Sequence, residues 1–136
     1  MEIVLRYARA ADHSLPEGHG PAMERLRGHL TAQAERIRGS GVAYGCLLGT
    51  LASDGAHAGE KVREGVREAL DGWTDAMTAT IAEGQASGEI TGAWSAAALA
   101  AFLLDFFEGA ALRATTTADH AHLGDELGIA LPALSP

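Results

Sequence analysis

The chain has 136 residues, of which 47% are hydrophobic and 21% charged, so it is long enough and apolar enough to fold as one domain around a single core. Its net charge of −8 argues against a surface that grips a nucleic-acid backbone, because such a surface needs clustered lysine and arginine. Strong helix formers are abundant, proline is scarce and β-branched residues form no alternating runs, so the composition predicts an all-α fold.

A short helix is predicted over residues 2–11, with Ile3, Leu5 and Tyr7 as its bulky side chains. No N-cap residue precedes it, which is typical of the interior of a longer helix. The early charges, and the lack of a small-residue cleavage site after an apolar core, argue against a secretory signal. Residues 12–21 are predicted to form a loop, because glycine, proline and serine gather there.

A second helix is predicted over residues 21–38, and a shorter one over residues 45–52. The apolar side chains of the longer helix recur at steps of three and four and so share one face: Met23, Leu26, Leu30, Ala34 and Ile37. His29 and Gln33 lie one turn apart beside that face. The shorter helix carries Cys46, the one cysteine of the chain, which excludes an internal disulfide and favours a reducing compartment such as the cytoplasm.

The clearest helical pattern covers residues 58–86. Its apolar side follows a period of 3.6 residues and carries Val62, Val66, Leu70, Trp73, Met77, Ile81 and Gly84. The other side is charged, so the pattern predicts an amphipathic helix roughly 40 Å long. Ser87 and Gly88 are predicted to end it.

The next helix, predicted over residues 94–116, contains the most apolar stretch of the chain, AWSAAALAAFLLDFFEGAAL. This stretch is apolar on nearly every side, whereas a surface helix normally has a polar face. A chain of this length has difficulty covering such a helix alone, so we expect a second copy of the chain to cover part of it. Asp105 and Glu108 make it a poor membrane span, since an aspartate near the bilayer centre costs about 2.5–3.5 kcal/mol.

A final helix over residues 119–131 completes the expected antiparallel bundle of about six helices. Gly109, flanked by alanines, allows a partner helix to approach closely in a homodimer. The residues expected at this pairing surface are Leu103, Leu104, Phe107, Glu108, Gly109, Leu112, Arg113, Leu123 and Leu127. For the charged members, a solvent-facing strip of a partly exposed helix stays an open alternative.

The expected binding site is a pocket between helices for a small, mostly apolar molecule, as ligand pockets of helical domains usually are. Its expected lining is Leu26, His29, Leu30, Gln33, Cys46, Leu47, Leu51, Trp73, Met77, Phe102 and Phe106. Ordinary core packing is the alternative for the apolar members. His29 and Gln33 are more informative, because a polar side chain on a partly apolar face needs a partner, either a ligand or a structural hydrogen bond.

The sequence carries no residue pattern typical of an enzyme, a metal site or a cofactor site. His120 and His122 point apart on a helix, and His13 and His19 lie in the predicted loop, so we expect no metal. Cys46 lacks a local nucleophile motif, and no glycine-rich phosphate loop follows a strand. We therefore expect no cofactor and no catalysis, with a small helical enzyme as the weakest of the alternatives.

Three segments are similar to one known group of proteins when they are taken together. They are YGCLLGTLASD at residues 44–54, VREALDGWTDAMTATIAEGQASGEIT at 66–91 and ALAAFLLDFFEGAALRATTT at 98–117. Their order and spacing resemble the C-terminal domain of tetracycline-repressor-type (TetR family) transcriptional regulators. The resemblance implies an all-helical homodimer that encloses a pocket for a small-molecule effector and pairs through its last two long helices as a four-helix bundle.

The resemblance also implies a mechanism, in which effector binding changes the distance between two DNA-reading heads and so releases or permits operator binding. We expect the regulator to be a repressor. The family's N-terminal helix-turn-helix has no counterpart in this sequence. Residues 1–136 are therefore expected to form a single ligand-binding and dimerisation domain, with 1–11 as the remnant of the linking helix. DNA is then contacted only through an absent N-terminal domain, and no membrane is contacted. The alternative is a headless protein that acts only by protein–protein pairing.

Overall fold

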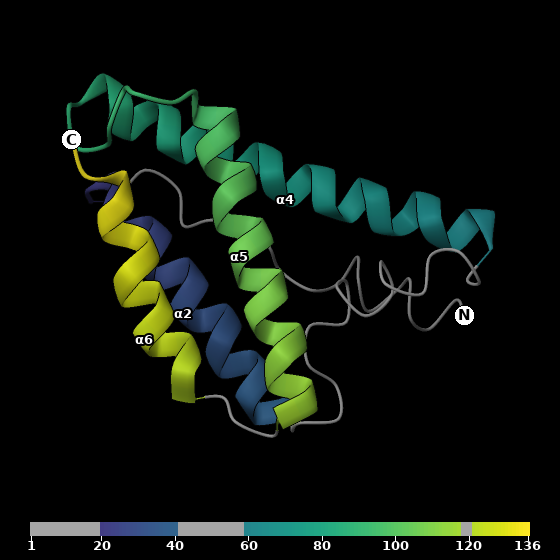
Figure 1. Cartoon of the computed structure of the whole chain (residues 1–136). Helices are drawn as coiled ribbons and strands as arrows, with labels where there is room; N and C mark the ends of the chain where they lie inside the picture. Colours follow the sequence, from purple (N-terminus) through teal and green to yellow (C-terminus); the bar gives the residue numbers. More distant parts are fainter. Residues whose placement is uncertain (1–19, 41–58, 118–120) are drawn as a thin grey trace.

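The computed structural model describes residues 20–40, 59–117 and 121–136. Within these ranges the chain forms helices and no strand: α2 (Ala22–Ser40), α4 (Glu60–Ala86), α5 (Ala96–Thr117), α6 (Ala121–Ala130) and the 3₁₀ turn η1 (Leu131–Leu134) (Figure 1). The predicted all-α class is confirmed for this part of the chain. The helices predicted over residues 2–11 and 45–52, and with them the expected total of about six, lie outside the described residues.

The helix ends lie close to their predicted positions, and local chemistry explains the differences. α2 continues to Ser40, past its predicted end. α5 begins two residues late because Ser95 is its N-cap, with the Ala98 N–H donating to Ser95 Oγ at 3.1 Å. After α6 the chain tightens into η1, where Pro132 lacks the N–H that a further α-helical turn requires.

α4 is amphipathic, as its sequence period predicts. Its buried residues are Val62, Gly65, Val66, Trp73, Met77, Thr80, Ile81 and Gly84. Leu70, which we expected on the same stripe, is half-buried. Trp73, Met77 and Ile81 are no more than 1% exposed, so this stretch of α4 forms one wall of the core.

The turn that ends α4 is held by its backbone. Gly88 has φ +81°, a left-handed conformation that favours glycine, and the Gly84 carbonyl accepts the N–H groups of Glu89 at 2.9 Å and Ile90 at 3.1 Å. The Thr91 N–H then donates to the carbonyl of Leu134 at 2.7 Å. The predicted end of the helix at Ser87–Gly88 is confirmed, and the turn after it is tied to the end of η1.

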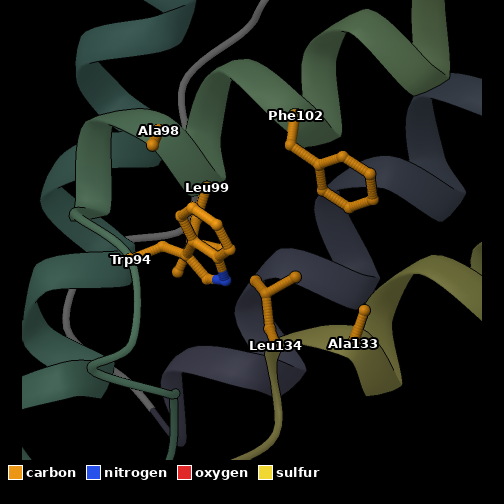
Figure 2. A pocket seen from close by; sticks show the side chains of 6 residues that line it. All are labelled: Trp94, Ala98, Leu99, Phe102, Ala133 and Leu134. Carbon is orange, nitrogen blue, oxygen red and sulfur yellow. The ribbon is translucent and has the colours of Figure 1, made fainter.

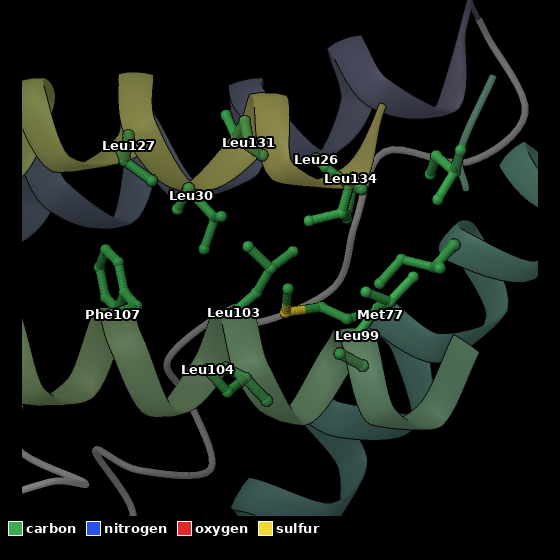
Figure 3. Packing of buried hydrophobic residues seen from close by; sticks show 14 of the residues in the cluster. Leu26, Leu30, Met77, Leu99, Leu103, Leu104, Phe107, Leu127, Leu131 and Leu134 are labelled. Carbon is green, nitrogen blue, oxygen red and sulfur yellow. The ribbon is translucent and has the colours of Figure 1, made fainter. Parts of the chain in front are cut away.

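The core lies between the helices and draws side chains from all of them (Figure 3). α4 packs against α5 and α2, and α6 runs beside α2 and against α5 with the opposite chain direction to α5 (Figure 1). Leu30 of α2, Met77 of α4, Leu103 and Phe107 of α5 and Leu127 of α6 meet there, each no more than 5% exposed. Burial of side chains this size contributes about 1.5–3 kcal/mol each to folding.

α5 turns one side to this core and leaves another side uncovered by the described residues. Leu99, Leu103 and Phe107 are buried, whereas Phe102 is 46% and Leu112 39% exposed. The helix has almost no polar face, so its inward side is selected by where α4 and α6 pack and not by its own amphipathicity. No described helix is both long enough and apolar enough to cross a membrane.

Candidate functional site

A buried histidine and a buried tryptophan meet between α2 and α4. The Trp73 indole N–H donates to His29 Nε2 at 2.7 Å. Both residues are buried, with Trp73 1% and His29 4% exposed. Their rings contact edge to face at 5.8 Å, and Trp73 contacts Phe107 of α5 in the same way at 5.9 Å. Because Nε2 accepts a hydrogen bond, His29 is neutral here and carries its proton on Nδ1.

Most of the described members of the predicted pocket lie around this pair. Gln33 follows His29 by one turn of α2 and is 8% exposed. Leu26, Leu30 and Met77 are fully buried in the same cluster. The structure therefore brings together an apolar wall and two polar side chains, His29 and Gln33, that face the interior.

The other predicted pocket residues are placed differently. Phe106 is half-buried against the core, whereas Phe102 is exposed and lies on a separate surface groove. Cys46, Leu47 and Leu51 lie outside the described residues. Whether the cluster around His29 encloses an effector stays a prediction.

The residues expected at the pairing surface divide into two groups. Side chains buried inside the chain are Leu103, Leu104, Phe107, Leu123 and Leu127. A side chain covered by its own chain gives a partner no surface, so these residues pack within the single chain. Gly109, Leu112 and Arg113 are exposed and Glu108 is half-buried, and Arg113 forms an ion pair with Glu126 of α6 in the same chain.

An apolar groove of about 320 Å³ opens between the start of α5 and η1 (Figure 2). Its described lining is Trp94, Ala98, Leu99, Phe102, Ala133 and Leu134. Of these residues, only Phe102 belongs to the binding site predicted from the sequence, where it is expected in the interior pocket. The signal for the groove was a tryptophan just ahead of a helix without a polar face, but its other wall comes from a segment over thirty residues later in the chain.

A smaller groove of about 180 Å³ lies between α2 and α6. It is lined by Arg27, Thr31, Ala34, Glu35, Leu123, Gly124, Leu127 and Gly128. Among residues 20–40, 59–117 and 121–136, no three histidine, cysteine or acidic side chains converge as a metal site would require.

A carboxylate from the α4–α5 connection holds the first turn of α2. Glu89 Oε2 accepts the N–H of Ala22 at 3.2 Å and the hydroxyl of Ser87 at 2.9 Å. The Ser87 hydrogen bond, followed by the backbone N–H of Ala22, lowers the pKa of Glu89 from its ordinary value. Arg25 on the next turn of α2 also pairs with Glu83 of α4, so the start of α2 is fixed to the end of α4.

Comparisons with known proteins agree with this architecture. Residues 22–126 match the family model described as "Tetracyclin repressor-like, C-terminal domain". A solved structure, the regulatory protein TetR from Rhodobacter sphaeroides, superposes with a TM-score of 0.81 at 26% sequence identity, over 96% of this chain and 69% of that chain. No curated protein matches the sequence. Since the family model covers most of the chain, the chain belongs to the family of tetracycline-repressor-like C-terminal domains.

Proposed function

We propose that this chain is the effector-sensing and dimerisation domain of a cytoplasmic TetR-type transcriptional regulator. Its membership of the family and its similarity to a solved TetR regulator support the regulator class. The observation that carries the sensing role is the pair of buried polar side chains, His29 and Gln33, facing an otherwise apolar interior next to Trp73. Apolar pockets with a few convergent polar groups are typical of small-molecule sites.

The proposed effector is a small, mostly apolar molecule that binds between α2, α4 and α5. It would exchange contacts with the His29–Trp73 pair and so favour one arrangement of α2 relative to α4. The first turn of α2 is fixed to the end of α4 by Glu89 and by the Arg25–Glu83 ion pair, so a shift of α4 moves the start of α2. We propose that residues 1–11 continue this relay towards a DNA-binding domain, in a regulator that acts as a repressor.

A thermal-shift screen of small apolar compounds, read by Trp73 fluorescence, tests the sensing role. A compound at a hundred times its dissociation constant stabilises the folded domain by roughly 2.7 kcal/mol, which raises Tm by several degrees. Gln33→Leu should reduce the shift given by compounds that carry a hydrogen-bonding group, while Thr31→Val, on the exposed side of α2, should leave it unchanged. A hit that shifts both variants as much as the wild type would place the effector elsewhere.

The proposed homodimer uses the outward side of α5 and α6. Among the described residues, the large apolar side chains that remain exposed are Trp94 at 67%, Phe102 at 46%, Leu112 at 39% and Ile129 at 74%. All of them lie on α5, on α6 or in the turn before α5, and exposed apolar side chains gathered on one part of a molecule are typical of an association site. The helices of two copies would form a four-helix bundle, and light scattering at micromolar concentration should give twice the chain mass.

The alternative function is pairing without effector sensing, as in a headless protein that forms inactive heterodimers. The tight packing of Leu26, Leu30 and Met77, each at 0% exposure, favours this alternative over a permanently open pocket. Two observations separate the functions. An effector hit in the screen supports the sensor. A helix-turn-helix encoded in frame upstream of Met1 also supports the regulator, whereas an in-frame stop directly upstream favours the headless protein.

A further inference from the structure

We propose that the groove beside Trp94 is an anchor of the homodimer and is filled by side chains of a second copy of this chain. The proposal rests on the homodimer described above and adds to it a specific contact outside the two helices themselves. Trp94 belongs to the turn before α5, and the far wall of the groove belongs to η1 (Figure 2).

The turn that presents Trp94 is held by several hydrogen bonds within the chain. Gln85 Nε2 donates to the carbonyls of Thr91 at 3.0 Å and Trp94 at 2.9 Å, and the Ala93 N–H donates to Thr91 Oγ1 at 3.1 Å. The Thr91 N–H also donates to Leu134 O, which joins the turn to the opposite wall. A site that is already ordered loses little conformational entropy on binding, so its apolar contacts contribute fully to affinity.

The chemistry of the groove suits an apolar side chain. Its described lining residues carry no charge, and Trp94 and Phe102 together present two aromatic rings at the surface (Figure 2). Exposed tryptophan is costly in water, and tryptophan residues beside a pocket are enriched among the side chains that dominate binding energy. A small polar ligand would find no charged or amide side chain among the lining residues.

A second copy is the favoured occupant because the groove is continuous with the proposed dimer face. Ala98 and Phe102 belong to the same exposed stripe of α5 as Gly109 and Leu112, and Ile129 precedes Ala133 by one turn. By contrast, the outward side of α4 is charged, at Glu64, Arg67, Glu68, Asp71 and Asp75. The exposed apolar side chains therefore extend from the groove along α5, where Asp105 interrupts the stripe between Phe102 and Gly109.

The area of the face also favours including the groove. α5 has 22 residues and is about 33 Å long, α6 has 10 residues and is about 15 Å long, and each helix is about 10 Å wide. Their outward side therefore offers about 480 Å², well below the roughly 800 Å² per partner of a standard interface. The Trp94 turn and η1 enlarge the face towards that size, and twofold symmetry would fill two such grooves per dimer.

Trp94 provides a direct readout of the contact. The wild-type protein is diluted from about 50 µM to about 50 nM, and tryptophan emission and acrylamide quenching are compared with the mass from light scattering. Trp73 is buried within each chain, so a change with concentration comes from Trp94, and the Trp94→Phe variant should show none. We expect the dimer to have blue-shifted emission and slower quenching than the dissociated chain.

A matched pair of charge substitutions tests the same contact by affinity. Ala98→Arg places a charge at the mouth of the groove, and Ala82→Arg places one on the outward side of α4; both alanines are exposed in helices, where arginine is well tolerated. We expect Ala98→Arg to weaken dimerisation by about thirtyfold or more and Ala82→Arg to leave it unchanged, as for a well-packed anchor site. Circular dichroism checks that both variants fold.

The outcomes separate this proposal from the homodimer itself. A dimer in which Trp94 stays open to acrylamide, and which tolerates Ala98→Arg, overturns the anchor and leaves the α5–α6 dimer standing. A chain that stays monomeric throughout overturns both. If Ala98→Arg fails to fold, Trp94→Ala at its exposed position gives the same comparison, with unchanged dimer affinity counting against the anchor.

Discussion

At the scale of single residues, the contact between His29 and Trp73 sets the chemistry of the interior. It satisfies an indole N–H that would otherwise be buried without a partner, and it fixes the tautomer of the histidine. The pair joins α2 to α4 and, through Phe107, to α5. A ligand that enters this region must either keep that hydrogen bond or replace it.

Removing the acceptor should destabilise the domain. His29→Ala removes the acceptor of the Trp73 N–H and opens space in the core, which should cost about 2–4 kcal/mol in the free energy of unfolding. Urea denaturation followed by tryptophan fluorescence measures the loss. His29→Gln retains an acceptor and should recover part of the stability, and equal losses for both variants would show that the hydrogen bond contributes little.

Glu89 should make the stability of the domain depend on pH. Its pKa is lowered in the folded chain, so its contribution is present above the unfolded pKa near 4.5 and is lost as the pH falls through the lowered folded value. Glu89→Gln should therefore be less stable than the wild type at pH 7, with the gap closing in the acid range. Thermal unfolding at pH 7, 4 and 3 tests this, with Glu64→Gln on the outward side of α4 as a control for the loss of one surface charge.

At the scale of elements, close packing at the end of α4 requires a glycine at position 84. A Cβ atom on Gly84 would lie 2.5 Å from Ile90 Cδ1 and 3.0 Å from the Cβ of Ala22. Both distances are shorter than van der Waals contact, so α2, α4 and the following turn approach one another only because residue 84 is glycine. This junction also carries Glu89, so two independent contacts hold the start of α2.

Two glycine substitutions on α4 should have opposite effects. Gly84→Ala should lower the free energy of unfolding by about 1 kcal/mol, because overpacking at 1–3 kcal/mol outweighs the gain in helix propensity. Gly72→Ala, with nothing within 4 Å of the added Cβ, should instead stabilise the helix by about 0.5–1 kcal/mol. Urea denaturation of both variants gives the comparison, and a stabilised Gly84→Ala would mean that Ile90 moves aside at little cost.

At the scale of the whole molecule, the distribution of exposed apolar surface is uneven. The large apolar side chains that stay exposed among the described residues belong to the α5–α6 side, while the outward side of α4 is charged. Helices from one chain cover the inner side of α5 completely, with Leu103 at 0% and Phe107 at 1% exposure. The uncovered side is thus the natural place for a second copy.

Gly109 tests this arrangement without disturbing the fold of the single chain. A side chain added there meets nothing within 4 Å, so Gly109→Gln should preserve or raise the stability of the chain itself. In the proposed bundle the same side chain would hold the two copies apart, and dimer affinity should fall at least tenfold by analytical ultracentrifugation. Gly72→Gln on α4, equally open, should leave affinity unchanged, and so would Gly109→Gln if α5 lies outside the interface.

The sequence by itself determined the helices of the described part of the chain and the inward stripe of α4. When apolar residues repeat every 3.6 positions and the opposite side is charged, only the apolar side of the helix can face the core. It also determined that Ser87 and Gly88 end α4, since a left-handed turn there favours glycine. These properties are local, and neighbouring residues in the chain are enough to define them.

Only the tertiary structure decided which side of α5 is buried. That helix is apolar nearly all round, so its sequence does not distinguish Phe102 at 46% exposure from Phe107 at 1%; the packing of α4 and α6 does. The same is true of the His29–Trp73 hydrogen bond and of the Trp94 groove, whose partners are separated by long stretches of chain. Contacts of this kind depend on the relative positions of helices, which a one-dimensional pattern does not specify.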